Sequence, residues 1–183
     1  MYSHLYRYLC ALLLCIWLLP QPASADEKAP DFAVQAAMMR LFTSFLQWPS
    51  NPPTINVCVY GESKIPGSAL IQNLYSKPPT GGLPLSLQTI KDWKSAAKNC
   101  QVLFIDASEE AKLDEITVAL KAYPVVTISN VDKFTEKGGM IEFVSEDTEG
   151  KSVVRYIVNR NHLKASGINI TNPEILAKAK TIL

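Results

Sequence analysis

The order of apolar and polar positions along the chain changes repeatedly between a helical and a strand-like period. Between residues 31 and 48 apolar side chains recur every three or four positions, which predicts an amphipathic helix. Asp31 can cap the start of this helix, and Pro49 prevents its continuation. The apolar stripe consists of Phe32, Ala36, Met39, Phe42 and Leu46.

Four short apolar segments follow and predict strands that alternate with helices. The expected strands are 55–60, 85–89, 102–105 and 125–128, and the expected helices are 68–76 and 108–122. Residues 102–105 are apolar at every position, which is typical of a parallel strand covered on both faces. Alternating strands and helices therefore predict a mostly parallel sheet with helices on both faces.

The pattern changes near the C-terminal end of the sequence. The expected elements there are strands at 140–144 and 152–158, a polar turn at 146–150, and helices at 161–166 and 174–182. Gly167 is expected to end the first of these helices, and Pro173 to precede the second. The expected fold class is a three-layer, doubly wound α/β sheet with a C-terminal antiparallel hairpin.

The first 25 residues differ from the rest of the chain. They carry one basic residue, Arg7, and no acid before an apolar run of about 11 residues. This run is shorter than the ~20 residues of a membrane-spanning helix. Ala23 and Ala25 fit the positions that a signal peptidase recognises, so cleavage is expected after Ala25. Residues 1–25 are predicted as a signal peptide, and residues 26–183 as a single periplasmic domain that does not insert into the membrane.

Charge is balanced after the signal. The chain has 18 basic and 17 acidic residues, and because Arg7 lies in the signal, 17 basic residues face 17 acidic ones. The sequence therefore lacks the basic surplus that favours nucleic acid or anionic lipid. No nucleic-acid partner is expected.

Two of the four cysteines, Cys58 and Cys100, follow the signal. In an oxidising compartment such a pair favours one disulfide, and two buried free thiols are the alternative. With His162 as the one histidine after the signal, these residues lack the spacing of a metal site. No metal and no cofactor are expected.

Catalytic motifs are missing from the sequence. No glycine-rich phosphate loop follows the first strand, and no serine stands in a nucleophile elbow. His162 is expected on a solvated surface turn, and the acids around Asp147 lack the spacing of a calcium loop. The chain is predicted not to be an enzyme, and a hydrolase that uses His162 is the rival hypothesis.

Three side chains suit either packing or binding. Phe45 and Trp48 lie off the main apolar stripe, so they either pack on the sheet or reach a partner or a small-molecule groove. Arg155 either protects an edge strand against aggregation or anchors a partner's carboxylate. A crevice is also expected where the first and third strands end, near Tyr60 and Asp106, which keeps a small-ligand-binding module as the alternative function.

Several separated segments occur in an order that resembles the YfiR family of periplasmic regulators. They are FLQWP (45–49), INVCVYG (55–61), NCQVLFI (99–105), GGMI (138–141), VRYIVN (154–159) and LKASGI (163–168). Each segment is weak alone, but their order and spacing together are fairly specific. The resemblance covers nearly the whole chain after the signal.

The resemblance implies a repressor. Proteins of this kind bind the periplasmic sensor domain of a YfiN-type inner-membrane diguanylate cyclase and hold it inactive. A YfiB-type outer-membrane lipoprotein sequesters the repressor under envelope or redox stress, after which cyclic-di-GMP and biofilm formation rise. A homodimer is a further partner that the sequence leaves open. The candidate residues for the contact surface are Phe45, Trp48, Met140 and Arg155.

The resemblance also carries structural expectations. Cys58 and Cys100 match the long-range disulfide of the family, and Asn159 matches an asparagine that caps the following short helix. Better-known members have a second cysteine pair around the segment that matches residues 133–140, where this chain has none and Met140 stands nearby. The resemblance therefore carries no expectation of redox control through a second bridge.

Overall fold

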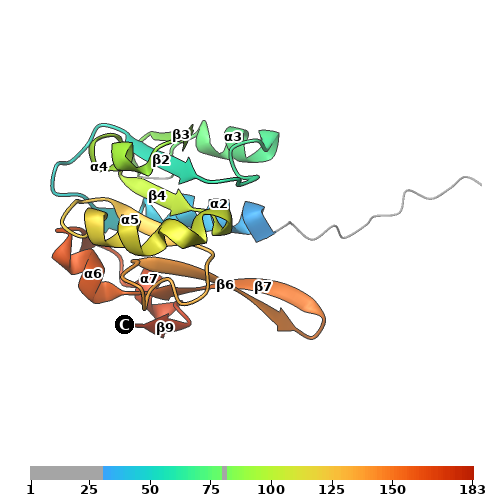
Figure 1. Cartoon of the computed structure of the whole chain (residues 1–183). Coiled ribbons are helices and arrows are strands. Elements are labelled where there is room, and N and C mark those ends of the chain that lie inside the picture. Colours follow the sequence, from blue (N-terminus) through green and yellow to red (C-terminus); the bar gives the residue numbers. More distant parts are fainter. Residues whose placement is uncertain (1–30, 80–81) are drawn as a thin grey trace, which may run out of the picture.

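The computed structural model describes residues 31–79 and 82–183. Its helices are α2 (Asp31–Phe42), α3 (Ala69–Tyr75), α4 (Ala96–Asn99), α5 (Leu113–Leu120), α6 (Arg160–Ala165) and α7 (Glu174–Ala177), with 3₁₀ helices η2 (Trp93–Ser95) and η3 (Ala107–Lys112). Its strands are β1 (Leu46–Gln47), β2 (Ile55–Tyr60), β3 (Leu85–Ile90), β4 (Val102–Ile105), β5 (Val126–Ser129), β6 (Ile141–Thr148), β7 (Lys151–Val158), β8 (Asn169–Ile170) and β9 (Thr181–Ile182). Figure 1 shows their arrangement.

Seven strands form one sheet in the order β3-β2-β4-β5-β6-β7-β9. The strands from β3 to β6 are parallel to their neighbours, β7 runs antiparallel to β6, and β9 runs parallel to β7. The five parallel strands follow the order found in flavodoxin-like sheets. The predicted mostly parallel α/β sheet with an antiparallel hairpin is therefore confirmed.

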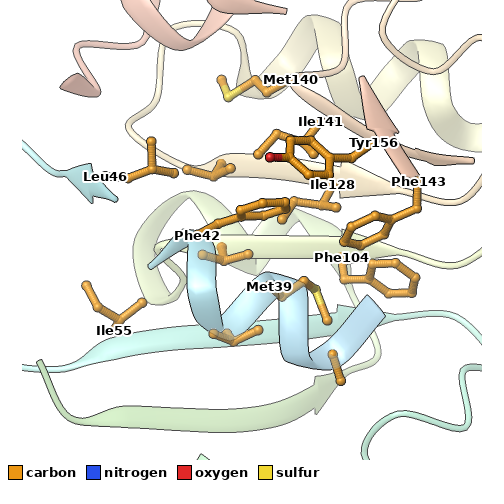
Figure 2. Packing of buried hydrophobic residues seen from close by; sticks show 14 of the residues in the cluster. Met39, Phe42, Leu46, Ile55, Phe104, Ile128, Met140, Ile141, Phe143 and Tyr156 are labelled. Carbon is orange, nitrogen blue, oxygen red and sulfur yellow. The ribbon is translucent and has the colours of Figure 1, made fainter. Parts of the chain in front are cut away.

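Side chains of the parallel strands alternate between two apolar cores. Val57 and Val59 face the core that contains residues of α2 and α3, whereas Cys58 and Tyr60 face the core that contains residues of α4 and α5. This alternation is the two-residue period of an extended strand. Phe42 of α2 points into the first core (Figure 2). The sheet therefore separates the α2 side of the domain from the α5 side.

Helix α2 is shorter than the sequence predicts. It ends at Phe42, and hydrogen bonds from Ser44 N to Leu41 O and from Phe45 N to Phe42 O then tighten the chain into a turn. Residues 46–47 form β1, which pairs antiparallel with β8. This long-range pairing, which periodicity does not record, replaces the last predicted turns of the helix.

The helix predicted to begin at Ser108 is divided in two. The segment η3 comes first, and its cap is Asp106, whose carboxylate accepts the N–H of Ser108 at 3.1 Å. Glu109 has φ −108° and ψ 16°, outside the helical region, and α5 begins at Leu113. The backbone break at Glu109 therefore delays the start of the regular helix.

The hairpin is longer, and its turn tighter, than predicted. β6 and β7 are each eight residues long and stay in register over their whole length. Glu149 and Gly150 close the turn with φ values of 55° and 76°. Left-handed backbone at both positions makes the turn compatible with the twist of the two strands. Residues 146–148 therefore belong to β6 instead of the loop.

The last predicted helix is also cut short. α7 ends at Ala177, and residues 181–182 add to the edge of β7 as the short strand β9. Lys180 N donates to Tyr156 O at 2.8 Å, and Leu183 N donates to Val158 O at 2.9 Å. Backbone groups on the edge of β7 thus take the place of further helical turns.

Two smaller predictions are confirmed at the two ends of α6. Asn159 caps α6, because its Oδ1 atom accepts the N–H of His162 at 3.0 Å. Gly167 follows α6 with φ +81°, a conformation that favours glycine.

The predicted signal peptide lies outside the described residues. Among residues 31–79 and 82–183, no helix is both long enough and apolar enough to cross a membrane.

Candidate partner-binding groove

A groove of about 420 Å³ opens between α2, β7 and α7. Phe45 and Arg155, which the sequence singled out for separate reasons, both line it. The fold brings them together because the chain turns directly after α2, beside the hairpin strand β7. The other lining residues are Met38, Leu41, Phe42, Val154, Tyr156, Ala177 and Lys178.

Aromatic rings form the floor of this groove. Phe42 meets Tyr156 edge-on, with ring centroids 4.9 Å apart and an interplanar angle of 67° (Figure 2). The hydroxyl of Tyr156 donates to the backbone oxygen of Ile175 at 2.9 Å, which fastens β7 to α7. Burial raises the pKa of Tyr156 above its usual value, so the phenol remains a donor. The floor is therefore apolar, and Tyr156 is held by contacts with both α2 and α7.

Arg155 and Lys178 are the cations among the residues that line the groove, and both are exposed; as neighbours along β7, Arg155 and Tyr156 direct their side chains to opposite faces of the strand, so Arg155 lies outside the aromatic floor. The Nζ atom of Lys178 lies 3.5 Å from Glu174 Oε2. The pKa of Glu146 is lowered chiefly by its hydrogen bond with Lys180 and further by the charge of Arg155. An apolar floor with a cationic rim suits a partner segment that carries an apolar side chain and a carboxylate.

Trp48 and Met140 do not reach this surface. Each is 3% exposed. The Nε1 atom of Trp48 donates to Gln101 O at 3.2 Å, and the N–H of Met140 donates to Thr127 Oγ1 at 3.2 Å. The turn after α2 directs Trp48 inward, and Met140 packs in the same core. Of the candidate contact residues, Phe45 and Arg155 are the two that the structure brings together.

The crevice expected at the ends of β2 and β4 is filled by the chain itself. Ser108 Oγ accepts the N–H of Glu62 at 2.9 Å. A Cβ atom added at Gly61 would lie 2.7 Å from the same oxygen, so the two segments are in close contact. Lys112 Nζ lies 2.7 Å from the hydroxyl of Tyr60 at this edge of the sheet. The cavity of about 420 Å³ lies elsewhere, at the groove.

His162 is half-buried, whereas the sequence predicted a freely solvated side chain. Its Nδ1 atom lies 3.4 Å from Gly139 O. Nearby, the hydroxyl of Thr117 donates to Lys137 O at 3.0 Å. Within the part of the chain that the structure describes, no hydroxyl or thiol is hydrogen-bonded to His162, and no three potential metal ligands cluster.

Cys58 and Cys100 form a disulfide, so this prediction is confirmed and the free-thiol alternative is wrong. Their Cα atoms are 5.9 Å apart, within the normal range for such a bridge. Both residues are buried in the core on the α4 and α5 side. The bridge therefore lies on the opposite face of the sheet from α2.

One buried polar residue, Glu142, was missed by the sequence reasoning. It is 2% exposed. Its Oε1 atom accepts the N–H of Lys133 at 3.1 Å, and its Oε2 atom accepts the N–H and the hydroxyl of Thr135 at 3.1 and 2.8 Å. The carboxylate thus holds the loop between β5 and β6, the segment in which members of the resembling family carry their second cysteine pair. A single acid inside an apolar strand was the available signal.

Sheet, disulfide and groove together define a small disulfide-bridged α/β domain. The chain belongs to the YfiR/HmsC-like family, whose profile matches residues 32–179. This family consists of periplasmic regulators of cyclic-di-GMP signalling, and its domain is regulatory. A search of the curated proteins finds no match.

Two solved structures are similar to this fold. A conserved domain protein from Vibrio cholerae O1 biovar El Tor matches with a TM-score of 0.51 and 14% identity, over 81% of this chain and 60% of that one. The ABC domain from Streptococcus pneumoniae, solved in complex with L-Trp, matches with a TM-score of 0.50 and 11% identity, over 74% of this chain and 58% of that one. The chain thus spans less than two thirds of each structure. At these identities the likeness shows the fold alone.

Proposed function

We propose that this chain is a repressor that binds the periplasmic sensor domain of an inner-membrane diguanylate cyclase of the YfiN type. Binding holds the cyclase inactive. Sequestration of the repressor on a YfiB-type outer-membrane lipoprotein releases the cyclase. The observation that carries this proposal is the family match over residues 32–179, nearly all of the described chain.

Repression of this kind needs no chemistry from the repressor. A protein that binds the inactive state of a cyclase better than the active state shifts the equilibrium by no more than that difference in affinity. A tenfold fall in cyclic-di-GMP synthesis therefore requires a preference of at least about 1.4 kcal/mol.

The groove lined by Phe45 and Arg155 is the proposed contact surface. Phe45 is half-buried beside an aromatic floor, and Arg155 is exposed at the rim. An apolar anchor in a pocket surrounded by polar groups is the arrangement that concentrates binding energy in protein interfaces. The rim cations favour a partner segment that carries a carboxylate.

Gene deletion and complementation test this function. Deletion should raise cyclic-di-GMP, measured by mass spectrometry, and the wild-type chain should restore the low level. Arg155→Glu should fail to restore it, because the rim charge is reversed. Lys121→Glu makes the same charge change at an exposed position directly after α5, away from the groove, and should restore repression as well as wild type does.

Two results separate the function from its surface. If deletion leaves cyclic-di-GMP unchanged both with and without envelope stress, the repressor function is contradicted. If deletion raises cyclic-di-GMP but Arg155→Glu and Phe45→Ala both repress fully at wild-type protein levels, the function stands and the groove is not its contact surface.

The size of the groove favours one second candidate, a small-ligand-binding module. A cavity of about 420 Å³ lies within the range of small-molecule sites. A thermal-shift screen with amino acids and nucleotides tests this candidate. A stabilisation that Phe45→Ala abolishes would support it, and an unchanged melting temperature with every compound would count against it. Both functions hold together if ligand occupancy changes the affinity for the partner.

A further inference from the structure

Strand β6 leaves the body of the sheet part of the way along its length. β5 pairs with it only at Ile141 and Glu142, whereas β6 continues to Thr148. Figure 1 shows the β6–β7 hairpin extending past the other strands. Beyond Glu142, no strand within 31–79 or 82–183 pairs with β6 on the side away from β7. Residues 143–148 on this side are called the β6 edge below.

The hairpin geometry identifies the backbone groups that face outward on the β6 edge. In a hairpin with a two-residue turn, the residues that flank the turn bond to each other, here Thr148 and Lys151. Hydrogen-bonded and non-hydrogen-bonded pairs then alternate along the strands. Phe143, Ser145 and Asp147 are therefore the positions beyond the last β5 pairing that direct both N–H and C=O away from β7, and Ser145 and Asp147 are the two farther from the end of β5.

A notch lies where β5 ends beside the β6 edge. It has a volume of about 210 Å³ and is lined by Asn130, Asp132 and residues 142–145. The notch provides space directly after the end of β5, in line with that strand.

The charges around the β6 edge favour a basic occupant. Asp132, Asp147 and Glu149 are exposed and acidic, and Lys133 and Lys151 are exposed beside them. Asp147 Oδ1 accepts the N–H of Gly150 at 2.8 Å, and Glu146 is already paired with Lys180. A second copy of this chain, paired through the same edge, would bring the same acids into the shared sheet, and like charges on facing strands destabilise pairing. A strand that carries lysine or arginine would instead pair with these acids.

We infer that the β6 edge receives an extended, lysine- or arginine-bearing segment of a partner protein, which adds to the sheet as a strand beside β6. Backbone hydrogen bonds to Ser145 and Asp147 supply affinity in this mode of recognition, and the acids supply selectivity. The notch beside Asn130 gives the start of the segment room next to the end of β5. The surface lies across β6 from β7 and is separate from the groove, so the inference does not depend on the proposed function of the groove.

Amide hydrogen exchange on the purified chain tests this inference with a short synthetic peptide of alternating valine and lysine. At saturation the exchange rates of the Ser145 and Asp147 amides should fall to roughly one tenth of their values without peptide, or lower, because these amides become hydrogen-bonded. The same peptide with glutamate in place of lysine should give no protection. A lysine peptide with N-methylated backbone should also fail, because it cannot pair.

Two variants of Ser145 form a matched pair. Ser145→Pro removes the outward N–H and should abolish protection at Asp147, whereas Ser145→Ala keeps the N–H and should bind like wild type. Both variants lose the Ser145 hydroxyl, which donates to Asp31 at 2.8 Å, so a difference between them cannot come from the loss of that hydrogen bond. If Ser145→Pro does not fold, Asp147→Lys tests the charge instead of the backbone, since it should weaken binding of the lysine peptide and permit binding of the glutamate peptide; Asp147→Asn, which keeps the acceptor for the N–H of Gly150, controls for the turn.

Several outcomes would overturn the inference. Unchanged exchange at Ser145 and Asp147 with saturating lysine peptide is one. Equal protection by the lysine and glutamate peptides is another, because the acids would then select nothing. Protection that appears without peptide as the chain concentration rises would show pairing between two copies, and protection without peptide at every concentration would show that the edge is already covered by the chain itself.

Discussion

Glu142 holds Thr135 by two hydrogen bonds to a single carboxylate oxygen, one from the N–H at 3.1 Å and one from the hydroxyl at 2.8 Å. Both residues are buried, at 2% and 1% exposure. The backbone oxygen of Thr135 in turn accepts a hydrogen bond from Asn159 Nδ2 at 3.2 Å. The loop between β5 and β6 is thus fastened to the sheet by side chains, without a covalent bridge.

Replacing this carboxylate should loosen the loop. Glu142→Gln keeps the size of the side chain but turns one acceptor into a donor, which then faces an N–H or a hydroxyl. We expect the free energy of unfolding to fall by about 1–3 kcal/mol in urea titrations. Amide exchange at Lys133 and Thr135 should accelerate. Glu136→Gln makes the same change at an exposed position of this loop and should leave both measurements near wild type.

Removing the disulfide should lower the free energy of unfolding by more than Glu142→Gln does. The bridge joins positions 42 residues apart in sequence, and in the chain-entropy model closing such a loop stabilises a fold by about 4 kcal/mol. The double variant Cys58→Ala with Cys100→Ala should lose stability of this order in urea. Reductant should destabilise wild type to a similar degree and leave the double variant unaffected. Equal stability of the oxidised and reduced wild type would contradict a structural role.

Alkaline pH should weaken the contact between α2 and α3. Tyr75 is 3% exposed, and its hydroxyl donates to Ala36 O at 2.9 Å. Burial raises the pKa of Tyr75 well above its usual value, with a smaller opposing effect from Arg40. Because the folded pKa is raised, the stabilisation is complete below pH about 10 and is lost as the pH rises further, by up to about 1.4 kcal/mol per pH unit.

Urea unfolding between neutral and alkaline pH measures this effect. Tyr75→Phe should be less stable at neutral pH, yet its stability should decline less steeply above pH about 10. Tyr123→Phe, at an exposed tyrosine, should follow wild type. Parallel curves for wild type and Tyr75→Phe would show that this phenol does not control the alkaline decline.

Trp48 provides a test of packing against partner contact. Trp48→Phe removes the hydrogen bond to Gln101 O and part of a buried ring, so we expect a loss of about 1–2 kcal/mol, measured by circular dichroism in urea. Repression of cyclic-di-GMP by this variant should equal that of wild type at matched protein levels. Weaker repression with unchanged stability would place Trp48 in the partner interface after all.

The sequence predicts the interior strands well for a physical reason. β4 and β5 are buried at every position; an unbroken apolar run marks β4, and in β5 the apolar Val126 and Ile128 alternate with the buried hydroxyl residues Thr127 and Ser129. β1 and β9 escape prediction because two-residue strands have no period of their own. Each depends on a partner far away in the sequence, β8 for β1 and β7 for β9.

The groove could be predicted only in part. Arg155 stands out as a charge on a strand with buried neighbours, and Phe45 lies off the apolar stripe of the helix. The same argument applied to Trp48 fails because the helix ends at Phe42, after which helical spacing no longer tells which way a side chain points. Lys178 carries no signal of its own, since it joins the groove through the packing of α7 on β7.

The position of the disulfide has a consequence for how the cell could read its redox state. Cys58 points to the α5 side of β2, whereas Val57 and Val59 on either side of it point to the α2 side, where the groove opens. The backbone of the sheet therefore separates the disulfide from the groove that we propose as the contact surface. Reduction of the bridge would therefore lower the stability of the whole sheet before it changed the affinity for a partner at the groove. We expect loss of the bridge to shorten the lifetime of the protein in the cell sooner than it changes the signal by degrees.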